Sequence, residues 1–148
     1  MMRRKQFVLT GTSPASASTA AVGAVLGGLS AFDFFQIDAI ITGGTGGTVD
    51  LYIQRQVDKT NDVWLDWVHF AQVSAATTKR YTVSSAGNGT ITEVGQMNTA
   101  LSGSLVLAAG TCVGGHPGDA VRLVATAGSG TSAGQTQTVY ITCFEELG

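Results

Sequence analysis

Hydrophobic and polar residues alternate along the middle of the chain, which is typical of half-buried β-strands. In the segment 49–57, the residues on one face are mostly apolar, namely Val49, Leu51, Ile53 and Val57. The alternate positions carry Asp50, Tyr52, Gln54 and Gln56. The segments 34–42 and 63–73 also have strand-like patterns. The pattern therefore predicts three strands, with the second one burying a single face.

Turn-forming residues separate these three segments. Gly43–Gly47 is rich in glycine, which allows the positive φ angles that a hairpin needs. Asp58–Asp62 is rich in side chains that hydrogen-bond to their own backbone in turns. We therefore expect the three strands to pair as an antiparallel β-meander.

Strand-like segments also flank this central region. They are residues 6–10, 79–84, 90–94, 104–109, 120–126 and 136–144. The segment 20–29 contains three glycines, which disfavour a helix, so we expect irregular or extended structure there. Glycine-rich Gly128–Gly134 is expected to join the last two strands as a hairpin. Short strands separated by turns predict an all-β fold, an antiparallel β-sandwich that is jelly-roll-like, with about eight strands and no long helix.

The length of 148 residues predicts one compact domain with a core of its own. Within it, we expect residues 1–31 to form an N-terminal strand or extended arm, and residues 32–148 to form the β-sandwich domain. Charged residues make up only 12% of the chain. Such a low share favours a protein that lies against other proteins, because the centres of interfaces are depleted in charge.

Charge and hydropathy also bear on the partners. The net charge of −2 argues against a nucleic-acid partner, since nucleic-acid-binding domains usually carry a basic patch. No apolar run has the roughly 20 residues needed to cross a bilayer, so we expect no membrane partner. The basic cluster Arg3–Lys5 lies too far from the apolar segment 20–29 for a signal peptide, so we expect no secretion. Cys112 and Cys143 are too few for a disulfide framework, and we expect two small buried residues that do not pair, with a bridge between neighbouring strands as the alternative.

The candidate chemistry is sparse. Gly128–Ala133 matches the spacing of a dinucleotide-binding glycine motif, but a strand follows it where that motif requires a helix. His69 and His116 are the two histidines, and Asp119 is close to His116 in sequence, but no nucleophile motif accompanies them. The acidic residues lack the spacing of a calcium loop. We therefore expect no enzyme activity, cofactor, metal or small-molecule substrate.

Two tryptophans are candidates for a contact surface. Trp64 and Trp67 are three residues apart, so on a regular strand they face opposite sides. We expect one of them in the core and the other exposed, where it contacts a partner protein or stacks on a sugar, and simple packing in the core or at a sheet edge is the alternative.

The basic start of the chain is a second candidate. Arg3, Arg4, Lys5 and Phe7 are expected to form an arm that docks on a partner, and a frayed, solvated terminus is the alternative.

Three stretches resemble small β-sandwich structural proteins of tailed bacteriophages. They are TVDLYIQ at 48–54, VWLDWVHFAQ at 63–72 and GDAVRL at 118–123. The chain looks like the head decoration, or cement, proteins and similar minor virion proteins. The resemblance implies a jelly roll or sandwich without catalytic residues that oligomerises, often as a trimer. It also implies the major capsid protein and sister subunits as partners, and a location on the capsid surface after synthesis in the host cytoplasm.

Two alternatives fit the same sequence. One is a carbohydrate-binding or receptor-binding β-sandwich module, which an exposed tryptophan on a concave face would favour. The other is a tail or connector component, which would differ from a decoration protein only in where it docks.

Overall fold

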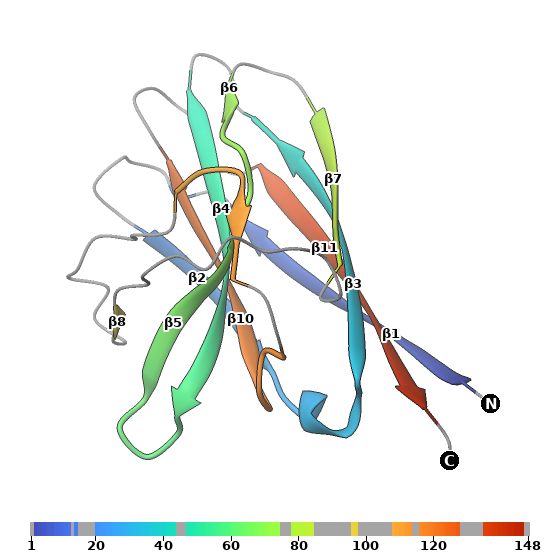
Figure 1. Cartoon of the computed structure of the whole chain (residues 1–148). Helices are drawn as coiled ribbons and strands as arrows, with labels where there is room; N and C mark the ends of the chain where they lie inside the picture. The colour runs from blue at the N-terminus through green and yellow to red at the C-terminus, as the bar shows by residue number, and fades with distance from the viewer. Residues whose placement is uncertain are drawn as a thin grey trace.

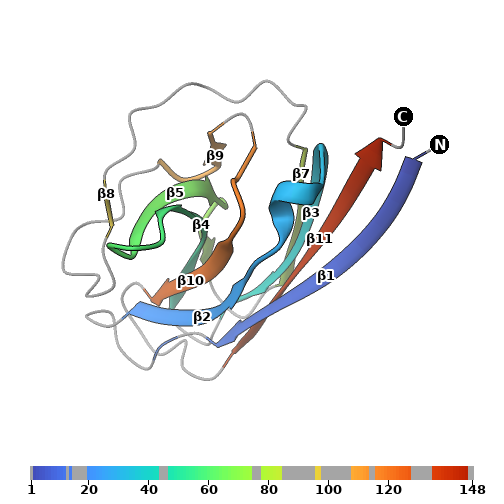
Figure 2. The same ribbon diagram turned by 90° about the horizontal axis from the view of Figure 1, so that it is seen from below.

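Two antiparallel β-sheets pack face to face in the computed structural model of this chain (Figures 1 and 2). The structure describes residues 2–12, 14, 20–43, 47–74, 78–84, 96–97, 108–113, 116–127 and 135–146. No α-helix occurs in these ranges. The prediction of an all-β sandwich is therefore confirmed.

The described residues form eleven strands and one turn of 3-10 helix, η1 (Leu29–Ala31). The longer strands are β1 (Met2–Thr12), β2 (Ala20–Leu26), β3 (Phe34–Thr42), β4 (Thr48–Asp58), β5 (Val63–His69), β7 (Thr78–Ser84), β10 (Val121–Ala127) and β11 (Thr136–Glu146). Three strands are only two residues long, namely β6 (Val73–Ser74), β8 (Gln96–Met97) and β9 (Thr111–Cys112).

The eight longer strands are paired in the nested order of a jelly roll. The first pairs with the last, β1 with β11, and the next pairs inward are β2 with β10, β3 with β7, and β4 with β5. One sheet has the order β1-β11-β3-β7, and the other has the order β2-β10-β4-β5-β8, with β6 and β9 at its side. Folding a four-pair hairpin over two sheets gives this arrangement, so the jelly-roll prediction is also confirmed.

Apolar side chains from both sheets fill the space between them. In β3 the buried and less buried positions alternate along the strand, as predicted. The centre of the core is formed by Phe35, Ile37, Ile41, Leu51, Ile53, Leu123, Val139 and Ile141. Alternation puts these side chains on one face of each sheet, and their burial is the main source of stability.

The predicted meander is wrong in its first half. β3 pairs with β11 and β7 in the four-stranded sheet, whereas β4 and β5 lie in the other sheet. Gly43–Gly47 therefore joins two sheets and not two neighbouring strands. The hairpin expected at Gly128–Gly134 is wrong for the same reason, although those residues lie outside the described ranges: β10 and β11 belong to different sheets. Alternation shows which face of a strand is buried, but it does not determine which other strand pairs with it.

The β4–β5 hairpin is confirmed. The backbone N–H groups of Thr60 and Asn61 donate to Asp58 Oδ1 at 2.8 and 3.1 Å. Asp62 ends the turn with a φ of 52°, a left-handed conformation that Asp tolerates better than most residues. The turn therefore forms in the way its composition predicts.

The remaining predicted strands have mixed outcomes. Those at 6–10, 79–84, 120–126 and 136–144 lie within or largely within β1, β7, β10 and β11. The segment 90–94 and residues 104–107 lie outside the described ranges, and residues 108 and 109 are not in a strand.

The N-terminal region is part of the sandwich. Residues 1–31 contain β1 and β2, each an edge strand of one sheet. Gly23 allows β2 to approach β1, because a Cβ there would lie 3.4 Å from Thr10 O. Gly11 allows β1 to lie close to β10, because a Cβ there would lie 2.9 Å from Leu123 Cδ2. The segment predicted as an arm thus closes one side of the sandwich.

The burial pattern of β4 yields a matched pair of substitutions. Ile53 is fully buried, whereas Val57 is 50% exposed on the same strand. Ile53→Ala should lower the free energy of unfolding by about 2–4 kcal/mol, because it removes apolar contact and leaves a cavity. Val57→Ala should change it by less than about 0.5 kcal/mol. Urea unfolding measures both values, and equal losses would contradict this core assignment.

Candidate interaction surface

A β-bulge shifts the alternation of β5. Ile53 pairs with Val68 and Gln54 pairs with Asp66, so Trp67 is an extra residue between these pairs. As a result Trp67 and Val68 both belong to the core cluster. Without the bulge, strict alternation would place Val68 on the opposite face.

The two tryptophans lie on opposite faces of the seven-stranded sheet, as predicted, but neither is exposed. Their exposed fractions are 1% for Trp64 and 2% for Trp67, so the expectation of one exposed tryptophan is wrong. Trp64 lies under the Arg122 guanidinium, whose Cζ is 4.3 Å from the ring centroid. Its Nε1 donates to Asp62 Oδ1 at 2.7 Å. A sugar would therefore find no exposed tryptophan ring on which to stack.

The face around Trp64 holds a buried polar network. The Arg122 Nε donates to Gln54 Oε1 at 2.9 Å, and Gln54 Nε2 donates to Asp66 Oδ1 at 3.0 Å. Gln54 and Asp66 are fully buried, and Arg122 is 4% exposed. Burial lowers the pKa of Arg122, and the negative charge of Asp62 partly opposes this. Such a network is stable only while its members keep their partners.

Gln54 links the two charged members of this network. Gln54→Leu should lower the free energy of unfolding by about 2–4 kcal/mol, because it removes a partner from a buried guanidinium and a buried carboxylate. Gln36→Leu is the matched control, since Gln36 is exposed and donates to Oδ2 of the half-buried Asp38. Thermal or urea unfolding tests both variants. Similar effects of the two changes would show that the network adds no stability.

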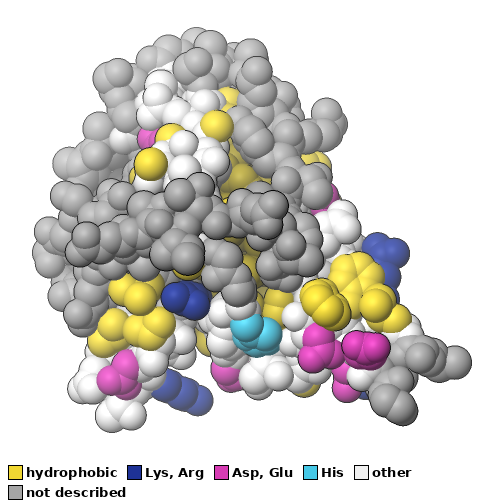
Figure 3. Space-filling view, in the orientation of Figure 1, with side chains coloured by type: hydrophobic (Ala, Val, Ile, Leu, Met, Phe, Trp, Pro, Cys, Tyr) yellow, Lys and Arg dark blue, Asp and Glu magenta, His cyan; other side chains and the backbone are white. Residues whose placement is uncertain are grey.

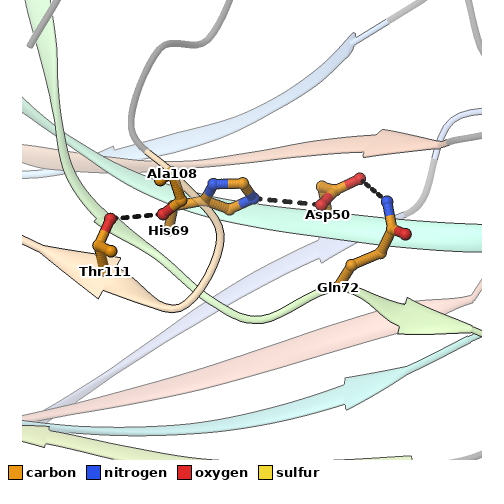
Figure 4. A network of polar contacts seen from close by, with 5 residues as sticks. All are labelled: Asp50, His69, Gln72, Ala108 and Thr111. Atoms are coloured by element: carbon orange, nitrogen blue, oxygen red, sulfur yellow. Dashed lines mark hydrogen bonds and ion pairs between the residues drawn. The ribbon is translucent and has the colours of Figure 1, made fainter.

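A second polar group lies further along the same face (Figure 4). The Asp50 Oδ1 and His69 Nε2 atoms are 3.1 Å apart, and Gln72 Nε2 donates to Asp50 Oδ2 at 2.7 Å. The Thr111 hydroxyl donates to the Ala108 carbonyl beside it. The contacts of Asp50 with His69 and Gln72 join β4 to the end of β5 and to the segment that follows β5.

The environment of Asp50 sets its ionisation. Burial alone would raise the pKa of Asp50, but the hydrogen bonds from His69 and Gln72 and the charge of His69 together lower it below its ordinary value of 3.8. Tyr52 stacks on His69 with ring centroids 3.8 Å apart, and burial with the nearby carboxylates raises its pKa. The pair Asp50–His69 thus holds a charged carboxylate within the fold.

The lowered pKa of Asp50 predicts a pH dependence. A carboxylate that ionises more readily when folded adds stability above its ordinary pKa of 3.8, and this is lost as the pH falls through the lower folded value. Asp50→Asn should therefore lower the free energy of unfolding by about 1–2 kcal/mol at neutral pH. The difference from the wild type should shrink below about pH 4. Asp38→Asn, on the other sheet, controls for net charge, and a pH-independent difference for Asp50→Asn would refute this role.

His116 and Asp119 do not converge on a common site. His116 Nδ1 accepts a hydrogen bond from Gly118 N at 2.9 Å, so Nε2 carries the proton and donates to Phe32 O at 2.8 Å. Asp119 Oδ1 accepts from the Ser30 hydroxyl at 2.8 Å, which lowers the pKa of Asp119. Both residues anchor the loop before β10 to the region around η1.

The two cysteines are free. Cys143 lies in the core, where burial raises the pKa of its thiol to about 11. Cys112 lies at the periphery of the same core. In the described part of the chain, no group of three or more His, Cys, Asp and Glu residues is arranged to hold a metal ion.

The basic start of the chain is an ordered strand. Arg3, Arg4 and Lys5 are exposed on β1, which pairs with β11 along its whole length. Arg3 Nη1 lies 3.6 Å from Glu145 Oε2, and Lys5 Nζ lies 4.6 Å from the centroid of the Phe7 ring. The structure thus brings the four predicted contact residues together, and the two tryptophans lie elsewhere.

A further candidate surface, which the sequence did not predict, is the outer face of the four-stranded sheet. Its described side chains are Met2, Arg4, Gln6, Val8, Thr10, Thr12, Phe34, Gln36, Asp38, Ile40, Thr42, Thr136, Thr138, Tyr140, Thr142, Phe144 and Glu146. Charge is confined to Arg4, Asp38 and Glu146. Val8 is 55% exposed and Phe34 is 43% exposed. Figure 3 shows hydrophobic side chains gathered near β3 and β11, with acidic side chains next to them.

Comparisons with known proteins give no relative. The chain matches no known protein family, and no curated protein matches it. In the described residues, no helix has the length and apolar character to cross a membrane.

Proposed function

We propose that this protein is a virion structural protein, a decoration or cement protein that binds the head of a tailed bacteriophage. The observation that carries the proposal is the outer face of the four-stranded sheet, which is broad, rich in threonine and, among its described side chains, charged only at Arg4, Asp38 and Glu146. The centres of protein interfaces are depleted in charged residues, because charged side chains are costly to desolvate. A surface that served only to stay in water would carry more charge.

The resemblance to phage head proteins in β4, β5 and the start of β10 supports the same proposal. Jelly rolls are common in virus capsids, although the fold alone does not specify a function. The buried network around Arg122 and the Asp50–His69 pair hold the sandwich together from the opposite face. The protein thus acts by binding, with major capsid protein on its outer face and sister subunits beside it.

The binding mechanism is the burial of apolar surface, repeated over many copies. Each Å² of apolar surface removed from water contributes about 25 cal/mol, and the side chains of Val8, Phe34 and Phe144 supply such surface. Threonine hydroxyl groups on the same face supply hydrogen bonds to the shell. A modest contact at every lattice position would hold neighbouring capsid subunits together and resist pressure from packaged DNA.

The proposal can be tested with phage heads that lack this protein. Added protein should bind the heads and raise the temperature at which they rupture. Val8→Glu and Phe34→Glu should weaken binding by about tenfold or more, since each would bury a charge in the interface. Val57→Glu is the matched control, because Val57 is exposed to a similar degree but lies on the other sheet.

Two results would contradict the proposal. One is that the protein neither binds the heads nor changes their rupture temperature. The other is that Val57→Glu weakens binding as much as Val8→Glu, which would exclude the outer face as the docking surface.

A further inference from the structure

β1 has a free edge. The strand order β1-β11-β3-β7 places it at the end of its sheet, and β11 is its only ladder partner among the residues that the structure describes. In Figures 1 and 2 it is the outermost strand on that side of the molecule. Alternate residues of an edge strand direct their N–H and C=O groups away from the sheet, where they can bind another strand.

Only the C-terminal end of β1 has a second neighbour. Thr10–Thr12 and Ala21–Gly23 line a groove of about 270 Å³ between the edges of the two sheets. A Cβ at Gly23 would lie only 3.4 Å from Thr10 O, so β2 comes close to β1 at this point. The open part of the edge is therefore Met2–Leu9.

The charge of this open part is unusual for the chain. Arg3, Arg4 and Lys5 are three of the eight Lys and Arg residues in the chain, and they are consecutive. The side chain of Arg3 is 65% exposed despite its contact with Glu145. Among the described residues, neither Arg4 nor Lys5 has an ion-pair partner. The following residues, Gln6–Thr10, carry no charge and suit a β-strand.

We infer that the open edge of β1 binds an extended, acidic segment of a partner protein, which adds to the four-stranded sheet as a further strand. The partner's main chain bonds to Met2–Leu9, and its carboxylates face the three cations. Arg4 points to one side of the sheet, whereas Arg3 and Lys5 point to the other. The partner segment therefore carries consecutive Asp or Glu residues, which reach both sides, next to an uncharged stretch. This inference concerns β1 alone and does not depend on the outer face binding a capsid.

The charges select between possible occupants. β1 contains no Asp or Glu, so a second copy of β1 has no carboxylate to place against Arg3–Lys5. Consecutive cations at one end of an edge strand oppose pairing with a copy of themselves and admit a strand of opposite charge. A nucleic acid is disfavoured because it has no peptide N–H and C=O groups with which to extend the ladder of β1.

The test uses short labelled peptides and the intact protein. One peptide has consecutive glutamates followed by alternating threonine and valine, and the second has lysines in place of the glutamates. Fluorescence polarisation at low salt should show binding of the glutamate peptide and much weaker binding of the lysine peptide. Lys5→Glu and Arg4→Glu should each weaken binding of the glutamate peptide by about fivefold to tenfold. Lys59→Glu makes the same charge change on an exposed turn and should leave binding within about twofold.

A second measurement separates strand addition from general attraction. Amide hydrogen exchange should slow in β1 when the glutamate peptide is bound, and should stay unchanged in β7 at the opposite edge of the sheet. The inference is overturned if the glutamate peptide does not bind, if the lysine peptide or a single-stranded oligonucleotide binds as well, or if Lys59→Glu has the same effect as Lys5→Glu. Binding without slower exchange in β1 would overturn the addition of a strand.

Discussion

Apolar contact between the two sheets is the interaction on which the rest of this structure depends. Ile37 and Ile141 of one sheet lie in the same core as Leu51 and Leu123 of the other. Each sheet packs one face against this core, so the other face of each sheet is directed outward. The two outer faces differ: the seven-stranded sheet buries Gln54, Asp66 and Arg122, whereas the four-stranded sheet exposes Val8 and Phe34 among threonines. The proposed function follows from that asymmetry.

The buried polar groups explain why the seven-stranded sheet is not the one proposed to bind. Gln54 hydrogen-bonds to both Arg122 and Asp66 below the surface, and Trp64 lies under the guanidinium. A partner on that face would have to replace contacts that already stabilise the fold. A partner that binds the outer face of the four-stranded sheet or the free edge of β1 would not have to replace such contacts. These two surfaces are adjacent along β1.

The fold class could be predicted because alternation is a local property: β3 and β4 each show their core face in the sequence. The partner of each strand could not be predicted, since the ladders join residues that are distant in sequence, such as Met2 and Glu146. The burial of Val68 in the core could not be predicted, because a bulge at Trp67 reverses the alternation of β5. The burial of Gln54 could not be predicted either, because it lies on the polar face of β4. The threonines at alternate positions near Thr138 were a visible signal of the outer face, but they indicate a surface only once β11 is known to have one exposed side.

Electron cryo-microscopy of phage heads saturated with the protein would test the central claim most directly, because it shows which side of the sandwich meets the shell. The account predicts jelly-roll density at regular positions on the head, with the four-stranded sheet against the capsid and the seven-stranded sheet turned away. Density with the seven-stranded sheet against the capsid, or density confined to the tail or connector, would contradict it.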